Sequence, residues 1–592
     1  MLYSLQTRTS TRLFVSERKQ IALMAEEKLP SRISLRLFTI NRSEMGIKMI
    51  IRDLVVMFAV VITLLLGMGL RIKKDISKRW NIIYVIPAVI SVIHFLISKM
   101  NIFICLVYFA AALELLLLIL YKRRVLSATI SVVSVFIAII PLILTNITNS
   151  NCYASLGYVE AFKEFHEDMK EHYALQKWKG TDFDSKYKEY IGEFEKAEKN
   201  KDKTAYISAM LSYMASYQDG HVQLWDMYEN FGLGSTRNIQ NTYADIYKNY
   251  YGMTMLKLDS GKYVAANVEK DSSAQKAGIK NGTVITKWNE KDIKQQLSNM
   301  KKIIPVNCFM FADVENIERF KPIFLSCMGG KKMEIEFLNE KGKRKVVTLN
   351  SMGNGYPYLY KTVGLFLQKD SEEEAEFYYN TFKNNIGYLQ VKGMGTDYDR
   401  IRSRIEKYIA QMKKDKISSL IVDVRNNAGG ADETGVILAE QFAKEDLFYL
   451  KETTYDGDSG KYVENRVLKI DAKNRIDVPI YLLVNSNCIS AGEGFAYNMA
   501  KLSNVTVVGI QGTNGSFGTI DGIDVMPEGM MGVFPSIACL DEDGSVMIDS
   551  KYHGTGGIKP EITIPVNREA VNQIFQKDYD YELEYLINSI II

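Results

Sequence analysis

The sequence is poor in the residues that build metal sites and disulfide frameworks. It has six cysteines and only five histidines among 592 residues, and the cysteines lie far apart with no C-x-x-C pair. This spacing supports neither a zinc site nor a disulfide framework, and no metal or organic cofactor is expected. The formal net charge is only +4, so the charge balance gives no indication of a nucleic-acid partner. The length exceeds what a single core needs, and several domains are expected.

Long apolar runs are concentrated near the N-terminus. Four of them have roughly the length of a bilayer span: Leu54 to Leu70, Ile82 to Ile97, Ile102 to Tyr121 and Val125 to Thr145. We therefore expect four transmembrane helices within residues 49–146, with three spans or a re-entrant second segment as the alternative. The basic loops at 71–79 and 122–124 are expected in the cytoplasm, which places the chain after the fourth span outside. The expected location is thus the cell membrane, multi-pass, with a large extracytoplasmic C-terminal part.

Residues 1–48 form a basic segment without the pattern of a signal peptide. They are either a cytoplasmic tail or precede a true start at Met45 or Met49. The two alternatives stay open.

A serine lies between a predicted strand and a predicted helix in the C-terminal half. The apolar run Ile480 to Val484 predicts a buried strand, a polar turn follows, and helical character begins at Ser490. The first amides of a helix have no internal partner and can receive a developing oxyanion. However, Ser490 and Glu493 also form the S-x-x-E pattern of a capping box, which needs no chemistry. Cys488 is disfavoured as a thiol nucleophile because it lies in the turn.

A second strand–turn–helix unit lies upstream. The run Ser419 to Val424 predicts a strand that ends in the glycine-rich turn of DVRNNAGG, before a helical stretch from Glu433 to Lys444. Open α/β sheets place their sites at the carboxyl ends of such strands. In this order and spacing, DVRNNAGG and NSNCISAGE resemble the core of the S41 serine peptidases, the tail-specific (C-terminal processing) and tricorn-like proteases. The resemblance implies that Ser490 is the nucleophile, with oxyanion donors from the amides of Ala491 and of Gly429 or Gly430.

The general base is expected to be a histidine. Tail-specific proteases carry a lysine about two dozen residues after their serine, but the matching region, Gly512 to Gly518, has none. The element DGHVQL around His221 resembles one found in the tricorn-like branch, and imidazole titrates near neutral pH. A turn histidine without a catalytic role is the alternative. The third member of a triad is left open among Asp219, Asp549 and His553, because the glutamate that the tricorn-like branch uses is replaced by Gly554.

The remaining segments predict a multidomain arrangement. Aromatic and methionine residues at helical spacing (Phe162, Phe165, Met169) predict the packed face of a helical subdomain at 155–245. The pattern from Val268 to Ile285 resembles a PDZ domain at 250–350, with a plain β-rich domain as the alternative. A mixed α+β and α/β protease core is expected at 383–570 and a C-terminal tail at 571–592.

The sequence therefore predicts a multidomain membrane protein that carries an S41-type serine endopeptidase. Its expected partners are the membrane and an extracytoplasmic polypeptide, whose C-terminus the PDZ-like domain would bind. The alternative function is a catalytically inactive peptide-binding receptor or scaffold of the cell envelope.

Overall fold

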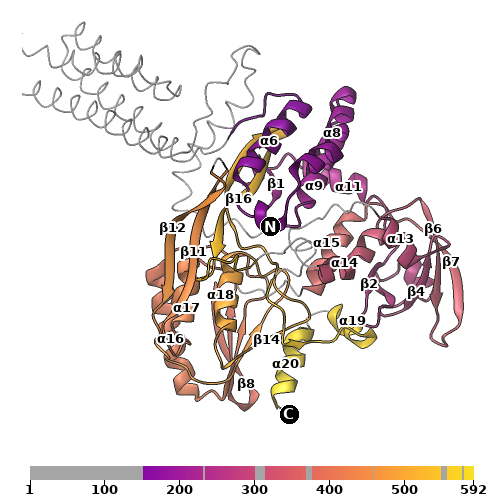
Figure 1. Ribbon diagram of the computed structural model, residues 1–592. Coiled ribbons are helices and arrows are strands. Elements are labelled where there is room, and N and C mark those ends of the chain that lie inside the picture. Colours follow the sequence, from indigo (N-terminus) through magenta and orange to yellow (C-terminus); the bar gives the residue numbers. More distant parts are fainter. Residues whose placement is uncertain are drawn as a thin grey trace, which may run out of the picture. The chain divides into compact units, whose positions relative to one another are not determined.

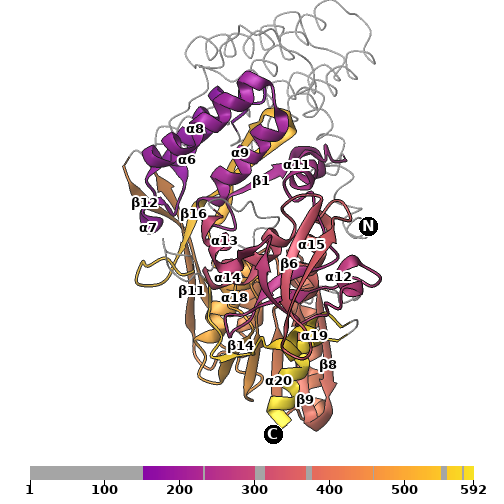
Figure 2. The ribbon, with the colours of Figure 1, turned by 90° about the vertical axis from the view of Figure 1, so that its right-hand side faces the viewer.

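The computed structural model describes the chain from residue 151 onward, and Cys152–Ile592 forms one compact unit (Figures 1 and 2). The described ranges are 151–230, 234–300, 314–367, 376–457, 459–548, 557–576 and 579–591. Three β-sheets lie within these ranges.

The expected fold class of a membrane protein, and its multi-pass location in the cell membrane, are corrected by the described helices. None of them is both long and apolar enough to cross a bilayer. The two longest, α8 (Phe183–Asn200) and α16 (Tyr398–Asp415), have 18 residues each. Both are strongly charged, as the α16 sequence YDRIRSRIEKYIAQMKKD illustrates. The four apolar segments within 49–146, and the basic segment 1–48, lie outside the described residues.

The central sheet has six strands in the order β17-β14-β13-β10-β9-β8. All neighbours pair in parallel except β8, which is antiparallel to β9. The strands are β8 (Phe377–Phe382), β9 (Ile386–Val391), β10 (Ser419–Asp423), β13 (Ile480–Leu483), β14 (Val505–Gly509) and β17 (Ile562–Thr563). The strands predicted from the apolar runs after residues 418 and 479 are confirmed as β10 and β13.

Helices cover both faces of this sheet, and all five residues of β10 are therefore buried. Leu420 and Val422 pack with α16, α17 (Asp432–Ala439) and α18 (Ala491–Ala500). Ile421 points to the opposite face, whose core includes Leu586 of α20 (Tyr581–Ile591). The alternation follows from the two-residue period of a strand.

A second, antiparallel sheet joins segments that are far apart in the chain. Its order is β1-β16-β11-β12, and β15 pairs with β16. The strands are β1 (Gln223–Asp226), β11 (Leu447–Asp456), β12 (Lys461–Ile470), β15 (Thr519–Met526) and β16 (Met530–Leu540). β1 starts two residues after His221 and pairs with β16. This pairing brings His221 to the sheet whose strands β15 and β16 come after Ser490 in the chain.

The predicted helical segment precedes β1. It contains α6 (Tyr158–His172), α7 (Gln176–Lys179), α8 and α9 (Lys203–Ala215), and after β1 come α10 (Met227–Asn230) and α11 (Asn238–Ile246). In both ribbon views α6, α8 and α9 lie next to β1 and β16. Phe162, Phe165 and Met169 are fully buried, and Phe162 stacks on Phe194 with ring centroids 4.0 Å apart. The aromatic stripe is therefore a packed face, as predicted.

The third sheet occupies the predicted β-rich segment. Its order is β2-β3-β4-β6-β7, with β5 paired to β4. The elements are β2 (Thr254–Lys257), β3 (Tyr263–Ala266), α12 (Ser273–Lys276), β4 (Val284–Trp288), β5 (Lys291–Asp292), α13 (Ile293–Asn299), α14 (Val314–Ser326), β6 (Lys332–Leu338) and β7 (Arg344–Asn350). The Ser272 hydroxyl caps α12 by accepting the Gln275 N–H at 3.1 Å. The PDZ resemblance of this domain stays a prediction.

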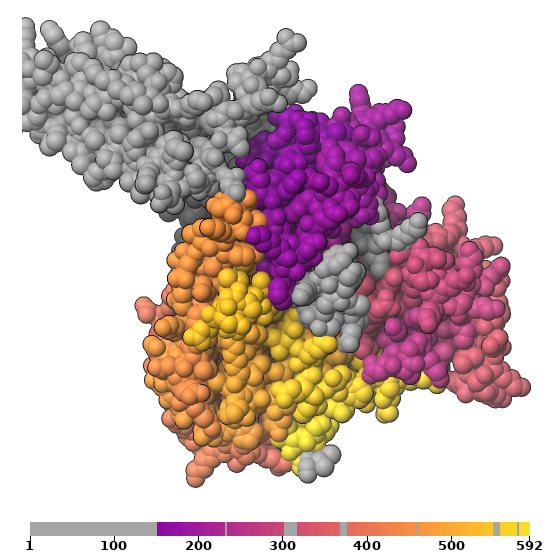
Figure 3. Space-filling model, viewed as in Figure 1, coloured from indigo at the N-terminus to yellow at the C-terminus, as the bar shows by residue number. Residues whose placement is uncertain are grey.

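The remaining elements connect these parts. They are α15 (Tyr356–Phe366), the 3-10 turns η3 (Lys383–Asn385) and η4 (Pro527–Gly529), α19 (Arg568–Ile574) and α20. In Figure 3 the C-terminal residues, in yellow, lie on the surface between the orange core and the magenta β-rich segment. Three hydrogen bonds join these regions. Arg568 Nε donates to the Gly282 carbonyl at 2.8 Å, the Val566 N–H donates to the Asp259 carboxylate at 2.7 Å, and the Asp259 N–H donates to the Val566 carbonyl at 3.2 Å.

Candidate active site

Ser490 lies at the connection from β13 to α18, directly before the first helical residue. Its backbone has φ 60° and ψ −136°, which is strained for a residue with a side chain and costs on the order of 1–3 kcal/mol. Two backbone hydrogen bonds hold the turn: the Ile489 N–H donates to the Asn427 carbonyl at 3.0 Å, and the Ser490 N–H to the Ser516 carbonyl at 3.1 Å. The Ser490 side chain makes no capping hydrogen bond, so the S-x-x-E pattern is not a capping box.

Glu493, the other residue of that pattern, binds the loop after β14 instead. Its carboxylate accepts the N–H groups of Gly515 at 2.6 Å and Ser516 at 2.9 Å. The side chain is fully buried, and burial raises its pKa to about 7. Glu493 thus holds the loop around Gly515 and Ser516 against α18. This is the region in which tail-specific proteases carry their lysine. No lysine lines the cavity beside Ser490.

Asparagines join the turn after β10 to the turn after β13. Asn426 Oδ1 accepts hydrogen bonds from Asn485 Nδ2 at 3.2 Å and Asn487 Nδ2 at 3.1 Å, and the Asn426 N–H donates to Asn485 Oδ1 at 3.0 Å. The two sequence motifs therefore meet at the carboxyl ends of adjacent parallel strands, where sites in open α/β sheets form.

The paired glycines after β10 approach their neighbours too closely for a side chain. Both have positive φ, 86° at Gly429 and 134° at Gly430. A Cβ on Gly429 would lie 2.6 Å from the Ser490 Cβ, and one on Gly430 would lie 2.0 Å from the Met394 carbonyl oxygen. The required close approach explains why glycine occupies both positions.

Two of the three predicted oxyanion donors are unused. The Gly429 N–H donates to Asn427 Oδ1 at 2.9 Å. Within the described part of the chain, no hydrogen bond uses the N–H of Gly430 or of Ala491. The geometry therefore leaves Gly430 and Ala491 available to a ligand oxygen, whereas Gly429 allows the close approach to Ser490.

His221 lies in the turn between α9 and β1 and is only 6% exposed. Asp219 holds the turn: one carboxylate oxygen accepts the His221 N–H at 2.8 Å, and the other accepts the Tyr173 hydroxyl at 2.8 Å. The Gly220 N–H donates to the Ser516 hydroxyl at 2.6 Å. The histidine turn therefore packs directly on the loop that also binds the Ser490 backbone.

Burial lowers the pKa of His221, although the Asp219 carboxylate and the Gly518 carbonyl act in the opposite direction. The ring is therefore mostly neutral at pH 7, the form that can accept a proton. Its Nδ1 is buried without a hydrogen-bond partner in the described structure. Of the groups considered for orienting it, Asp219 binds the His221 backbone and Tyr173 instead, while Asp549 and His553 lie outside the described residues.

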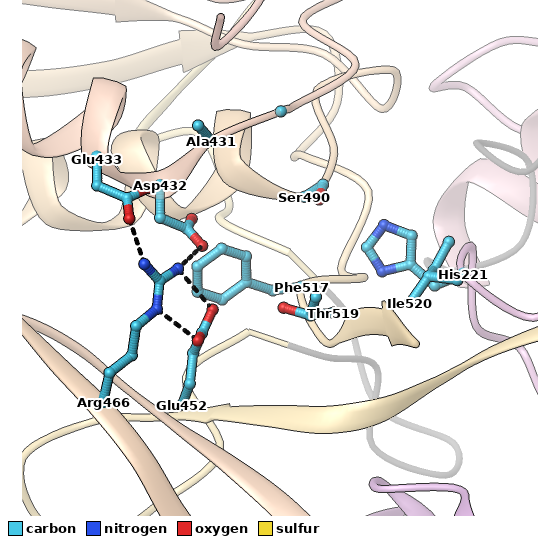
Figure 4. A pocket seen from close by; sticks show the side chains of 11 residues that line it. His221, Ala431, Asp432, Glu433, Glu452, Arg466, Ser490, Phe517, Thr519 and Ile520 are labelled. Atoms are coloured by element: carbon cyan, nitrogen blue, oxygen red, sulfur yellow. Dashed lines mark hydrogen bonds and ion pairs between the residues drawn. The ribbon is translucent and has the colours of Figure 1, made fainter. Parts of the chain in front are cut away.

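A cavity of about 200 Å³ is lined by both Ser490 and His221, together with Gly430 (Figure 4). No hydrogen bond joins the Ser490 hydroxyl to the imidazole. The lining residues that sequence reasoning missed include Asp432, Glu433, Glu452, Arg466 and Phe517. Asp432 and Glu433 were recognisable by their position just after the glycine pair, and Phe517 by its place in the loop after β14. Glu452 and Arg466 come from the β11–β12 hairpin, where no sequence motif indicated a functional site.

Cys488 is excluded as a nucleophile by its environment. It is fully buried, and burial, with the charges of Glu493 and Asp423, raises the pKa of its thiol well above the usual range. A thiol without thiolate character is inert. Over the described ranges, no group of three or more His, Cys, Asp or Glu side chains is placed to hold a metal ion.

A buried cluster of charges fixes the start of the glycine-rich turn to the C-terminal helix. Arg425 lies 2.7 Å from Asp423, 2.7 Å from Asp580 and 3.1 Å from Glu582. Glu582 also accepts the Ile510 N–H at 3.0 Å, and burial raises its pKa to about 7. Removing the cation from such a cluster is strongly unfavourable.

Comparison with known families identifies the central part of the chain. Residues 385–564 match the model of peptidase family S41. The chain contains a peptidase family S41 domain. This domain spans the five parallel strands of the central sheet and both sequence motifs, so the predicted resemblance to the family is confirmed. His221 lies outside the matched residues.

Similar proteins include C-terminal processing proteases. The chain is 23% identical over 249 residues to the carboxy-terminal processing protease CtpA of Bacillus subtilis (strain 168), an alignment that covers 42% of this chain and 43% of that protein. It is 27% identical over 239 residues to a probable CtpA-like serine protease of Staphylococcus saprophyticus, with 39% of each chain covered. The chain therefore spans less than half the length of these relatives.

Solved structures that this chain is similar to include mature CPAF complexed with lactacystin, with a TM-score of 0.48 and 13% identity over 73% of this chain and 97% of that one. The photosystem II D1 C-terminal processing protease gives a TM-score of 0.32 and 14% identity, over 72% of this chain and 99% of that one.

Proposed function

We propose that this protein is a serine endopeptidase that hydrolyses polypeptides through Ser490, with His221 as the general base. The observation that supports it most is the shared cavity, in which a strained serine and a neutral histidine lie beside two unused amides. The S41 domain supports a serine-type peptidase, and a peptidase of that family takes a polypeptide as its substrate.

In the proposed mechanism, the His221 imidazole accepts the proton of the Ser490 hydroxyl as the oxygen attacks the substrate carbonyl. The carbonyl oxygen becomes an oxyanion and receives hydrogen bonds from the N–H groups of Gly430 and Ala491. The imidazolium then protonates the leaving amine, and an acyl-enzyme remains on Ser490. A water molecule, deprotonated by the same imidazole, releases the acid and restores the serine.

The lowered pKa of His221 supports its role as a base. A base that is neutral at the working pH can take the serine proton without first losing its own. The ring and Ser490 line the same cavity in Figure 4. A rotation of the serine hydroxyl, or a small closure when substrate binds, would complete the hydrogen bond that the unliganded site lacks.

The β-rich domain at 250–350 is proposed to bind the C-terminus of the substrate, as a PDZ domain would. Its support is the five-strand antiparallel path with a short capped helix after β3, and an edge strand, β7, whose residues are mostly exposed. An added peptide strand requires such an edge. Peptides with a free C-terminal carboxylate should then compete with substrate better than the same peptides with a C-terminal amide.

Covalent labelling tests the nucleophile. A fluorophosphonate probe should label the wild-type protein at Ser490, and Ser490→Ala should abolish labelling. Ser589→Ala, which removes a hydroxyl from an exposed residue of α20, is the matched control and should label as the wild type does. Equal labelling of wild type and Ser490→Ala, or none in either, would remove the proposal.

A peptide-binding protein without catalysis is the second candidate. The buried Nδ1 of His221, which has no hydrogen-bond partner among the described residues, favours it, because a triad normally uses a third group to orient the ring. This candidate predicts peptide binding with no labelling of Ser490.

A further inference from the structure

The cavity beside Ser490 has an acidic far end. Arg466 from β12 holds Glu452 through two hydrogen bonds, Nε to Oε2 at 2.5 Å and Nη2 to Oε1 at 2.9 Å, and its Nη1 contacts Glu433. One guanidinium thus faces three carboxylates, the third being that of Asp432. Glu433 and Glu452 both pair with this cation, whereas burial, together with the charge of Glu452, raises the pKa of Asp432 to about 7.

Asp432 is the acid that this arrangement leaves unsatisfied. It is 92% buried, since 8% of its surface is exposed, and its Oδ1 has no hydrogen-bond partner in the described structure. Its Oδ2 lies 3.9 Å from Arg466 Nη2, which is too long for a hydrogen bond. Buried carboxylates are normally paired and hydrogen-bonded. Asp432 also lines the cavity, so a ligand there could supply the missing donor.

The route from Ser490 to Asp432 passes an aromatic ring. Figure 4 shows Ser490 and His221 at one end of the cavity, the carboxylates and Arg466 at the other, and the Phe517 ring between them. A side chain that reaches Asp432 from beside Ser490 would pass Phe517, which also lines the cavity. Lysine and arginine side chains suit this path, because each has an aliphatic chain that packs on apolar surface and ends in a cationic group.

We propose that the cavity is the specificity pocket for the residue whose carbonyl Ser490 attacks, and that Asp432 selects lysine or arginine there. The proposal rests on the proposed peptidase function. Glu433 and Glu452 add negative charge around the head, and Arg466 holds those two acids in place. A substrate acid at this position would instead meet the carboxylates without a free cation and should be rejected.

The test is the rate of cleavage, as kcat/KM, of peptides that differ only at that position. Wild type should prefer lysine or arginine to leucine by at least about tenfold and should disfavour glutamate. Asp432→Asn should lower the lysine-to-leucine ratio by at least about tenfold. Glu445→Gln, which neutralises an exposed acid between α17 and β11, is the control and should keep the wild-type ratio. Leucine cleaved as fast as lysine by wild type, or an unchanged ratio in Asp432→Asn, would overturn the proposal.

A second measurement needs no variant and covers the case in which Asp432→Asn does not fold. Butylammonium should slow fluorophosphonate labelling of Ser490 in the wild type, whereas 1-butanol, of the same length without charge, should not. Equal effects of the two would overturn the specificity proposal while labelling itself still supported the peptidase. Absence of labelling in the wild type would remove the peptidase proposal itself.

Discussion

Replacing Gly430 by alanine tests whether the backbone beside Ser490 is built for an oxyanion. The added Cβ would lie 2.0 Å from the Met394 carbonyl oxygen, at a residue with φ 134°. A side chain in such a backbone region costs about 1–3 kcal/mol, and an extra carbon forced into close-packed structure costs about 1–3 kcal/mol more. We expect Gly430→Ala to lower the free energy of unfolding by about 2–6 kcal/mol. Because relief of the clash must move the Gly430 amide, labelling of Ser490 should also slow by roughly 100-fold.

Gly544→Ala is the matched control. Gly544 has φ 83°, but a Cβ there would meet no atom within 4 Å. It should therefore show only the backbone cost of about 1–2 kcal/mol and label like the wild type. Chemical denaturation gives the free energies, and the rate of fluorophosphonate labelling gives the reactivity of Ser490. If the two variants lost equal stability and labelled equally fast, the close approach at Gly430 would not be what requires glycine, and its role as an oxyanion donor would lose its support.

Three further changes test other parts of the site. Because burial lowers the pKa of His221, the acidic limb of the labelling rate should lie below about pH 6.5, the usual value for histidine; a midpoint above it would contradict the buried, neutral ring. Arg425→Met should destabilise the fold by about 3–5 kcal/mol because three carboxylates lose their cation, whereas Arg475→Met, at a half-exposed ion pair, should cost less than about 1 kcal/mol; similar losses in denaturation would show that the buried cluster is not structural. Glu493→Gln should cost about 1–3 kcal/mol, since an amide offers one acceptor oxygen where two N–H groups need one each, and exposed Glu542→Gln should be neutral; an unchanged denaturation midpoint for the first would mean that the loop after β14 does not depend on that carboxylate.

The local pattern of the sequence predicted the central sheet well. Uninterrupted apolar runs of strand length identify β10 and β13 because strands buried on both faces need apolar residues at every position. The spacing of Phe162, Phe165 and Met169 likewise predicted a packed helix face. The membrane class was predicted from the apolar runs within 49–146, which lie outside the described residues. It was wrong for the described chain, where no helix is both long and apolar enough to cross a bilayer.

The candidate site was only partly predictable. The serine and glycine motifs are local, and each lies where a strand ends, so their meeting could be expected. The role of Glu493 could not be predicted. The S-x-x-E pattern is the same whether the carboxylate caps its own helix or, as here, accepts N–H groups from the loop after β14. Arg466 and Glu452 belong to a hairpin of the second sheet, and only the pairing of β11 with β16 brings them to the cavity.

The pairing of Arg425 with the last helix has a consequence for how the protein matures. Asp580 and Glu582 are synthesised after every strand of the central sheet. Until then Arg425, at the start of the glycine-rich turn, lacks two of its three carboxylate partners. A nascent chain would hold a nearly complete sheet whose reactive turn is still loosely fixed. The glycine-rich turn is therefore expected to reach its final geometry only after Asp580 and Glu582 have docked on Arg425.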